Sequence, residues 1–139
     1  MAARFDNRFD FVAGVFSKDK KKSREFGRSL GLDPSRCYNN YKIMAKNESA
    51  RSDGVQAIWI MPPSGDHYKI AREFIKNNVH IICYKPLTSN VEDALALEKL
   101  VHKNKIVFAL THNYSGYPML REAKKLVEKN KIGKIKVCL

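Results

Sequence analysis

The order of apolar and polar positions predicts strands and helices that alternate along the chain. Four apolar runs, rich in β-branched and aromatic residues, are too short for helices and end at turn residues, as buried strands do. They cover residues 11–17, 55–61, 79–84 and 105–111. Between them, apolar residues recur at intervals of three and four, which is the spacing of a helix with one buried face. This alternation predicts an α/β fold with a doubly wound parallel sheet, Rossmann-like in type.

Turn and capping residues set the expected helix ends. Helices are predicted to begin near Asp19 and near Asp66, and a short polar helix is expected to end near Ala50. Ser89 and Glu92 form an S-x-x-E capping-box pattern before another helix. A last helix, from about Pro118 to Gly133, should turn its apolar side inward. That side comprises Met119, Ala123, Leu126 and Val127.

One edge of this sheet is the expected place for chemistry. Ligands of open α/β sheets bind outside the carboxyl ends of the strands. The run 79–84 stops abruptly at Lys85-Pro86, and proline cannot continue a ladder, so the sequence predicts a strand that delivers Lys85 to this edge. A solvated lysine at a strand end is the alternative. The residues expected along the same edge are Ser17, Met61, Lys85 and Asn113.

Composition indicates one globular unit without a disulfide framework. The 139 residues are 44% hydrophobic, which is enough for one domain with a core and too few for two full ones. Cys37, Cys83 and Cys138 are odd in number and widely spaced, which disfavours disulfides and structural zinc. No apolar run could span a bilayer and no signal-peptide pattern is found, so a cytoplasmic protein without a membrane partner is expected.

A formal charge of +12 raises the question of polyanion binding. The lysines are spread over every predicted helix, and no nucleic-acid-binding motif accompanies them, so a nucleic-acid partner is disfavoured. Two alternatives to an enzyme stay open. One is a non-enzymatic basic module that binds nucleic acid or an acidic partner, and the other is an interaction protein that keeps the fold as a scaffold.

Motifs at three successive strand ends resemble those of one enzyme family. Tyr84-Lys85-Pro86-Leu87 stands where that family has Glu-Lys-Pro or Asp-Lys-Pro, and Met61-Pro62-Pro63 stands where it often has Thr-Pro-Asn. His67 falls at its recurrent histidine, and residues 111–114 look like one of its branches. The chain thus resembles the N-terminal Rossmann domain of the Gfo/Idh/MocA oxidoreductases over nearly its whole length.

The resemblance implies an NAD(P)-dependent dehydrogenase of a sugar, polyol or related hydroxy compound, with no metal. It implies that Lys85 lies near the nicotinamide and the reacting oxygen, where an ammonium can stabilise charge or transfer a proton, and that its bond to Pro86 is often cis. Alternatives of equal weight to ligand contact are that His67 is simply a residue in the first turn of a helix and that His112 and Asn113 form a polar turn. The implied cofactor-binding residues are Ser17, Lys18, Met61, Pro62, His67, Tyr84, Lys85, Pro86 and Asn113.

Departures from the family pattern shape the remaining expectations. Tyr84 replaces an acidic residue and Pro63 an asparagine, and the family's first strand, glycine-rich loop and first helix are not found. We therefore expect an incomplete dinucleotide-binding domain over residues 1–133 and the start of a substrate domain at 134–139. Such a fragment should be inactive by itself and bind cofactor weakly, and its parent is expected to be a homo-oligomer.

The end of the first predicted strand bears on cofactor choice. An acidic residue there holds the ribose 2′-OH of NAD, whereas small polar and basic residues accommodate the 2′-phosphate of NADP. Ser17 and Lys18 therefore favour NADP modestly, and Asp19 is interpreted as a helix-start residue.

Overall fold

The computed structural model describes residues 7–134 and 136. Within them, strands and helices alternate as the sequence predicts. The strands are β1 (Gly14–Val15), β2 (Cys37–Tyr38), β3 (Ala57–Ile60), β4 (His80–Tyr84) and β5 (Phe108–Thr111). The helices are α1 (Lys20–Ser29), α2 (Tyr41–Ser49), α3 (His67–Lys76), α4 (Val91–Asn104) and α5 (Pro118–Glu128), with short 3₁₀ turns η2 (Pro34–Arg36), η3 (Ser64–Asp66) and η4 (Asn113–Gly116).

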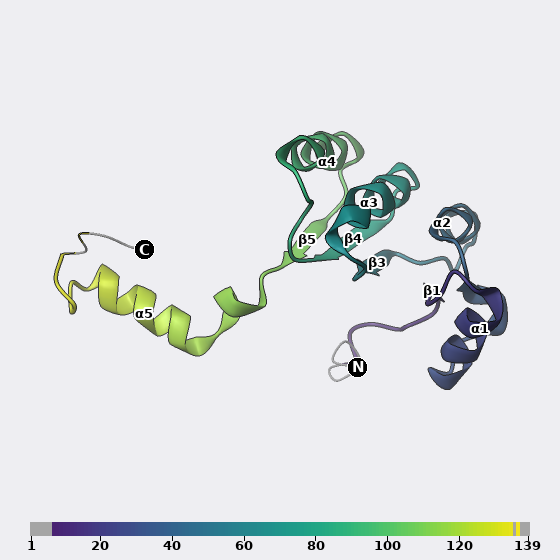
Figure 1. Ribbon diagram of the computed structural model, residues 1–139, viewed down its shortest axis with the longest axis horizontal. Coiled ribbons are helices and arrows are strands. Elements are labelled where there is room, and N and C mark those ends of the chain that lie inside the picture. Colours follow the sequence, from purple (N-terminus) through teal and green to yellow (C-terminus); the bar gives the residue numbers. More distant parts are fainter. Residues whose placement is uncertain (1–6, 135, 137–139) are drawn as a thin grey trace.

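Every strand pair is parallel, and the strands form two sheets. β1 pairs with β2, while β3, β4 and β5 are neighbours in that order. Helices α2, α3 and α4 pack side by side in one layer over the sheets, and α1 lies on the other side of β1 (Figure 1). The predicted α/β fold with parallel strands is therefore confirmed.

The strand order differs from the expectation in one respect. The runs 11–17 and 55–61 were expected to be neighbours in one sheet, yet within the described residues β1 is hydrogen-bonded to β2 and not to β3. The sequence did not predict β2, because two residues are too few to show a strand period. The two sheets nevertheless share one core, in which Ala13, beside β1, is buried together with Ile60 of β3.

Alternating burial shows which face of the larger sheet is covered. Ile58, Ile60, Ile81 and Cys83 are buried toward the helix layer, whereas Trp59, between them on β3, is 46% exposed. Each aliphatic side chain buried in this way contributes about 2 kcal/mol. The helix layer therefore fixes β3 and β4 firmly while their opposite face stays open in the described part of the chain.

Side-chain caps fix the helix starts near the candidate edge. Asp19 caps α1, since its carboxylate accepts hydrogen bonds from the backbone N–H groups of Lys21 and Lys22, as predicted. The capping-box prediction at Ser89 is wrong by one residue. Asn90 is the cap of α4 and accepts from Asp93 N at 2.8 Å, because its side chain can form this bond directly.

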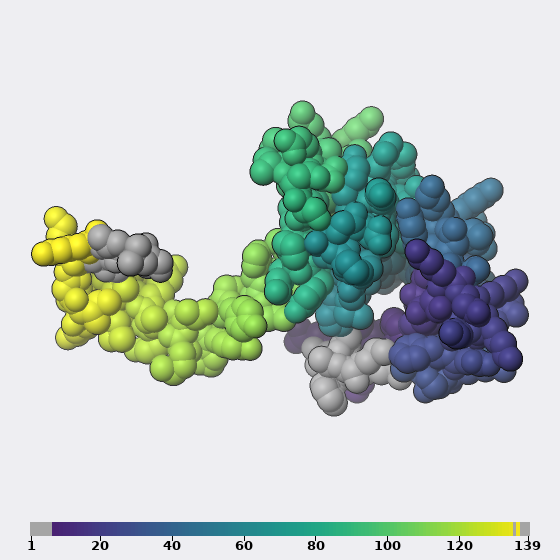
Figure 2. Space-filling view, viewed as in Figure 1, coloured from purple at the N-terminus to yellow at the C-terminus, as the bar shows by residue number. Residues whose placement is uncertain are grey.

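The prediction for the last helix is wrong in packing and length. Helix α5 ends at Glu128 and projects from the body as an arm (Figures 1 and 2). Its apolar side is exposed, with Met119 at 78% and Leu126 at 38%. The apolar residues do share one side of a helix, as predicted, but the described residues supply no surface that covers this side. No helix in this part of the chain is long and apolar enough to cross a bilayer.

Candidate functional site

The parallel register brings three predicted site residues to one edge. Ile60 pairs with Cys83, and Tyr84 pairs with Thr111, so the chain leaves β3, β4 and β5 at the same level. Met61, Lys85 and Asn113 follow these ends on neighbouring strands. Lys85 and Asn113 thus lie beyond the same edge of the sheet, as predicted. Ser17 and Lys18 follow β1, which belongs to the other sheet, so no strand register joins them to this row.

Lys85 projects from the end of β4 with an aromatic neighbour. Its side chain is exposed, and its Nζ lies 5.7 Å from the centroid of the Tyr84 ring. A ring face attracts a cation weakly, so Tyr84 is a favourable neighbour for the ammonium. The peptide bond from Lys85 to Pro86 is cis, as the resemblance implied.

His67 is buried beneath the strand ends rather than exposed at this edge. It is the first residue of α3, is only 1% exposed, and has both ring nitrogens within hydrogen-bonding distance of backbone carbonyls. Nε2 is 2.7 Å from the oxygen of Pro62 and Nδ1 is 2.8 Å from the oxygen of Pro86. The sequence indicated both prolines as site residues but could not show that one histidine contacts both.

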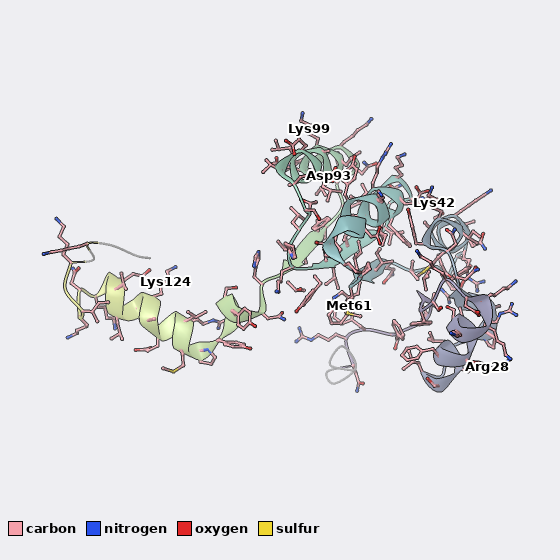
Figure 3. The ribbon with its side chains drawn as sticks, in the orientation of Figure 1. Arg28, Lys42, Met61, Asp93, Lys99 and Lys124 are labelled. Carbon is pink, nitrogen blue, oxygen red and sulfur yellow. The ribbon has the colours of Figure 1, made fainter. Side chains whose placement is uncertain are left out.

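The residues that flank Lys85 differ in exposure. Met61 is 63% exposed and lies on the side of the sheet away from α4, which carries Asp93 and Lys99 (Figure 3). Asn113 begins η4 and is exposed, as is His112. These side chains are therefore available to a ligand at the edge, whereas the carbonyl of Pro62 is already directed at His67.

The loop after β1 is built around a buried serine of α1. Ser23 is fully buried; its Oγ accepts from Phe16 N at 3.1 Å and donates to the carbonyl oxygen of Tyr38. This contact ties the ends of β1 and β2 together below Ser17 and Lys18. A serine at a core position of an amphipathic helix was the available signal.

The carboxylate of Asp19 is used to cap the N-terminus of α1. Its Oδ1 accepts from Lys21 N at 2.8 Å and from Lys22 N at 3.0 Å, and its own N–H donates to Ser17 Oγ at 3.1 Å. The carbonyl of Lys18 accepts from Asn39 Nδ2 at 3.3 Å. Ser17 and Lys18 therefore lie in a loop that these hydrogen bonds hold in place, and the side chain of Lys18 is exposed.

One further ionisable group near the edge is the buried thiol of Cys83. Burial raises the pKa of the Cys83 thiol to about 11, which keeps it protonated. Among residues 7–134 and 136, no group of three or more His, Cys, Asp or Glu side chains could hold a metal ion. The resemblance predicts Lys85 as the residue for proton transfer at this edge.

Comparison with known proteins agrees with this geometry. Residues 2–112 match the family described as "Oxidoreductase family, NAD-binding Rossmann fold". The uncharacterized oxidoreductase YfiI of Bacillus subtilis is 35% identical over 136 residues, which are 98% of this chain and 35% of that protein. The crystal structure of an oxidoreductase from Sinorhizobium meliloti is 44% identical, with a TM-score of 0.86 over 97% of this chain and 38% of that one.

A further solved structure carries ligands. The inositol dehydrogenase homologue of Azotobacter vinelandii, complexed with NADH and myo-inositol, is 36% identical, with a TM-score of 0.92 over 97% of this chain and 36% of that one. The chain spans about a third of the length of these relatives. The strand order, the edge that carries Lys85 and the match over residues 2–112 lead to one assignment: the chain belongs to the oxidoreductase family with an NAD-binding Rossmann fold.

Proposed function

We propose that this chain supplies most of the nucleotide-binding domain of an NAD(P)-dependent dehydrogenase that acts on a hydroxyl group of a sugar or polyol. The observation that carries the proposal is the position of Lys85, which is exposed beyond β4 between the ends of β3 and β5. The myo-inositol bound to the Azotobacter homologue supports a polyhydroxylated substrate.

Lys85 is proposed to manage the proton and charge of the reacting oxygen. A bound nicotinamide would supply the hydride acceptor for oxidation or the hydride donor for reduction. In the oxidising direction, the substrate C–H bond breaks as a hydride leaves, and the hydroxyl proton passes to the neutral amine form of Lys85, which becomes the ammonium. In the reducing direction, the Lys85 ammonium donates its proton to the carbonyl oxygen as that oxygen gains charge.

The loop after β1 is proposed to favour NADP over NAD. Asp19, the carboxylate nearest this strand end in sequence, already accepts two backbone hydrogen bonds as the cap of α1. A carboxylate in that role is poorly free to bind a ribose hydroxyl. Ser17 and Lys18 remain, and a hydroxyl and an ammonium suit a 2′-phosphate. The basic first turn of α1 adds to the positive field there.

Cofactor titration of the isotope-labelled chain tests the proposal. Because the chain is expected to bind weakly, NADPH and NADH are added to millimolar concentration while backbone amide signals are followed by NMR. We expect shifts at Ser17, Lys18, Met61 and Lys85, larger with NADPH. Lys18→Glu should remove the preference for NADPH, whereas Lys99→Glu on the far helix should not.

Two results would contradict this function. One is that neither dinucleotide shifts any backbone amide signal at the sheet edge formed by the carboxyl ends of the strands. The other is that an oligonucleotide shifts the lysines of α1 with an affinity that falls steeply with salt, which would favour the basic binding module.

A further inference from the structure

His67 is a buried ionisable side chain that the proposed proton transfer does not use. Its ring lies between two loops: residues 61–63 after β3, and residues 85–87 after β4. Both loops carry proposed site residues, and the ring contacts a backbone oxygen in each, at 2.7 Å for Pro62 and 2.8 Å for Pro86. We infer that His67 is a positioning residue that ties these two loops together and thereby holds the backbone of Lys85.

The backbone of Lys85 is held on both sides. Before it, Tyr84 is the last residue of β4 and pairs with Thr111 of β5. After it, the carbonyl of Pro86 is directed at His67 Nδ1. The histidine is 1% exposed, so water does not compete for these contacts. Neither neighbour of Lys85 can move without breaking a buried hydrogen bond or a ladder pair.

The chemistry of imidazole makes the tie depend on protonation. A carbonyl oxygen only accepts hydrogen bonds, and a neutral imidazole carries one N–H, so the neutral ring can donate to one of the two oxygens. The imidazolium form donates to both. The titratable group that faces the ring from β4 is the Cys83 thiol, with Sγ 3.5 Å from Nδ1, and it remains protonated because burial raises its pKa. No ion pair of His67 is found within the described residues.

The two bonds can be separated by substitution. The amide nitrogen of asparagine can take the place of Nδ1, and that of glutamine the place of Nε2. His67→Asn should therefore keep the bond to Pro86 and lose the bond to Pro62, while His67→Gln should do the reverse. His67→Phe fills the same space and loses both. His102→Gln, on the exposed side of α4, is the matched control.

Backbone amide signals of the whole 139-residue chain report the outcome without any cofactor. With His67→Phe we expect shifts of several linewidths at Met61 and Ser64 in one loop and at Lys85 and Leu87 in the other. His67→Asn should shift mainly the first pair and His67→Gln mainly the second, and His102→Gln neither.

The inference is overturned if a folded His67→Phe leaves either pair in place. Should His67→Phe not fold, the asparagine and glutamine variants, which each keep one bond, decide the matter: identical shifts in both would equally overturn it. The effect on Lys85 chemistry rests on the proposed function. A chain that passes this test but binds no dinucleotide would refute the function and leave the tie intact.

Discussion

Tyr84, the residue before Lys85, stands where the family's motif has an acidic residue. This difference affects how firmly the side chain of Lys85 is held. A ring face attracts an exposed ammonium by about 0.5–1 kcal/mol, so Tyr84 restrains the side chain only loosely.

The function assigned to Lys85 can be measured in a chimaera in which this chain replaces the matching part of the Azotobacter homologue. There, Lys85→Met should lower the rate of the chemical step about 10²- to 10⁴-fold, because a proton-transfer group is lost.

Single-turnover kinetics with myo-inositol separate chemistry from binding in that chimaera. The affinity for NADH should stay within a few-fold of the parent chimaera. Lys99→Met, which removes an exposed lysine of α4, should change neither quantity. Near-normal turnover in Lys85→Met would make Lys85 a solvated lysine at a strand end.

Cys83 should make the folded chain less stable as the solution becomes alkaline. Burial raises the pKa of its thiol from 9.0 to about 11, so between these values the unfolded chain has lost a proton that the folded chain retains. The free energy of unfolding therefore falls with rising pH in this window and is fully retained below pH 9. Tyr38, with a pKa raised from 10.0 to about 12, mainly by burial, adds a similar loss only above pH 10.

Urea denaturation at several pH values tests this assignment. Cys83→Ala should reduce the slope of stability between pH 9 and 10, although it lowers stability at every pH by opening a small cavity. Part of the slope should survive, because burial also raises the pKa of Cys37. An unchanged slope in the variant would show that the Cys83 thiol is not the titrating group.

Between α2 and β3, the chain passes too close to the helix for any side chain. A Cβ added to Gly54 would lie 1.9 Å from the backbone oxygen of Glu48, and backbone cannot swing aside as a side-chain tip can. Gly54→Ala should therefore destabilise the fold by about 1–3 kcal/mol or more. Gly65→Ala, where a Cβ would meet nothing within 4 Å, should be nearly neutral. Thermal unfolding compares the two, and equal stabilities would contradict the close packing.

The same loop adjoins an ion pair that no sequence pattern revealed. Arg36 and Glu48 form a buried pair, with side chains 9% and 0% exposed, and Asp53 O accepts from Arg36 at 3.1 Å. Glu48→Gln should cost about 3 kcal/mol, since the buried guanidinium then keeps only the exposed carboxylate of Asp53, 3.4 Å away, as a countercharge. Glu25→Gln, on the exposed side of α1, should cost less than about 0.5 kcal/mol. Similar urea midpoints for both variants would refute the stabilising role of the pair.

The sequence predicted an element well when that element depends on residues close to it in the sequence. The strand at 80–84 and the cap at Asp19 follow from neighbours in sequence, and both are confirmed. The two-residue strand β2 and the bonds from His67 to Pro62 and Pro86 depend on contacts between distant segments, which periodicity does not encode. At the candidate site, motifs predicted which residues follow the strand ends, whereas the buried supports beneath them required the structure.

At the scale of the whole molecule, two surfaces of the described residues lack internal partners. Among the described strands, β1, β2, β3 and β5 each pair with a strand on one side only, which leaves backbone N–H and C=O groups available along the sheet edges. Helix α5 exposes apolar side chains, and η4 is its main packing partner within the described chain. Unpaired edges and uncovered apolar surface both favour association between chains.

The purified chain should therefore self-associate at micromolar concentration. Sedimentation velocity over a range of concentrations measures this, and the chimaera provides the comparison, since it supplies the rest of a homologous protein. If the α5 surface is a main contact, Met119→Lys with Leu126→Lys should shift the distribution toward smaller species, whereas Lys124→Gln, whose ammonium lies near Glu128 on the same helix, should not. A chain that stays monomeric at all concentrations and unfolds cooperatively would show that these surfaces do not need partners, and the stand-alone binding module would then account better for the molecule.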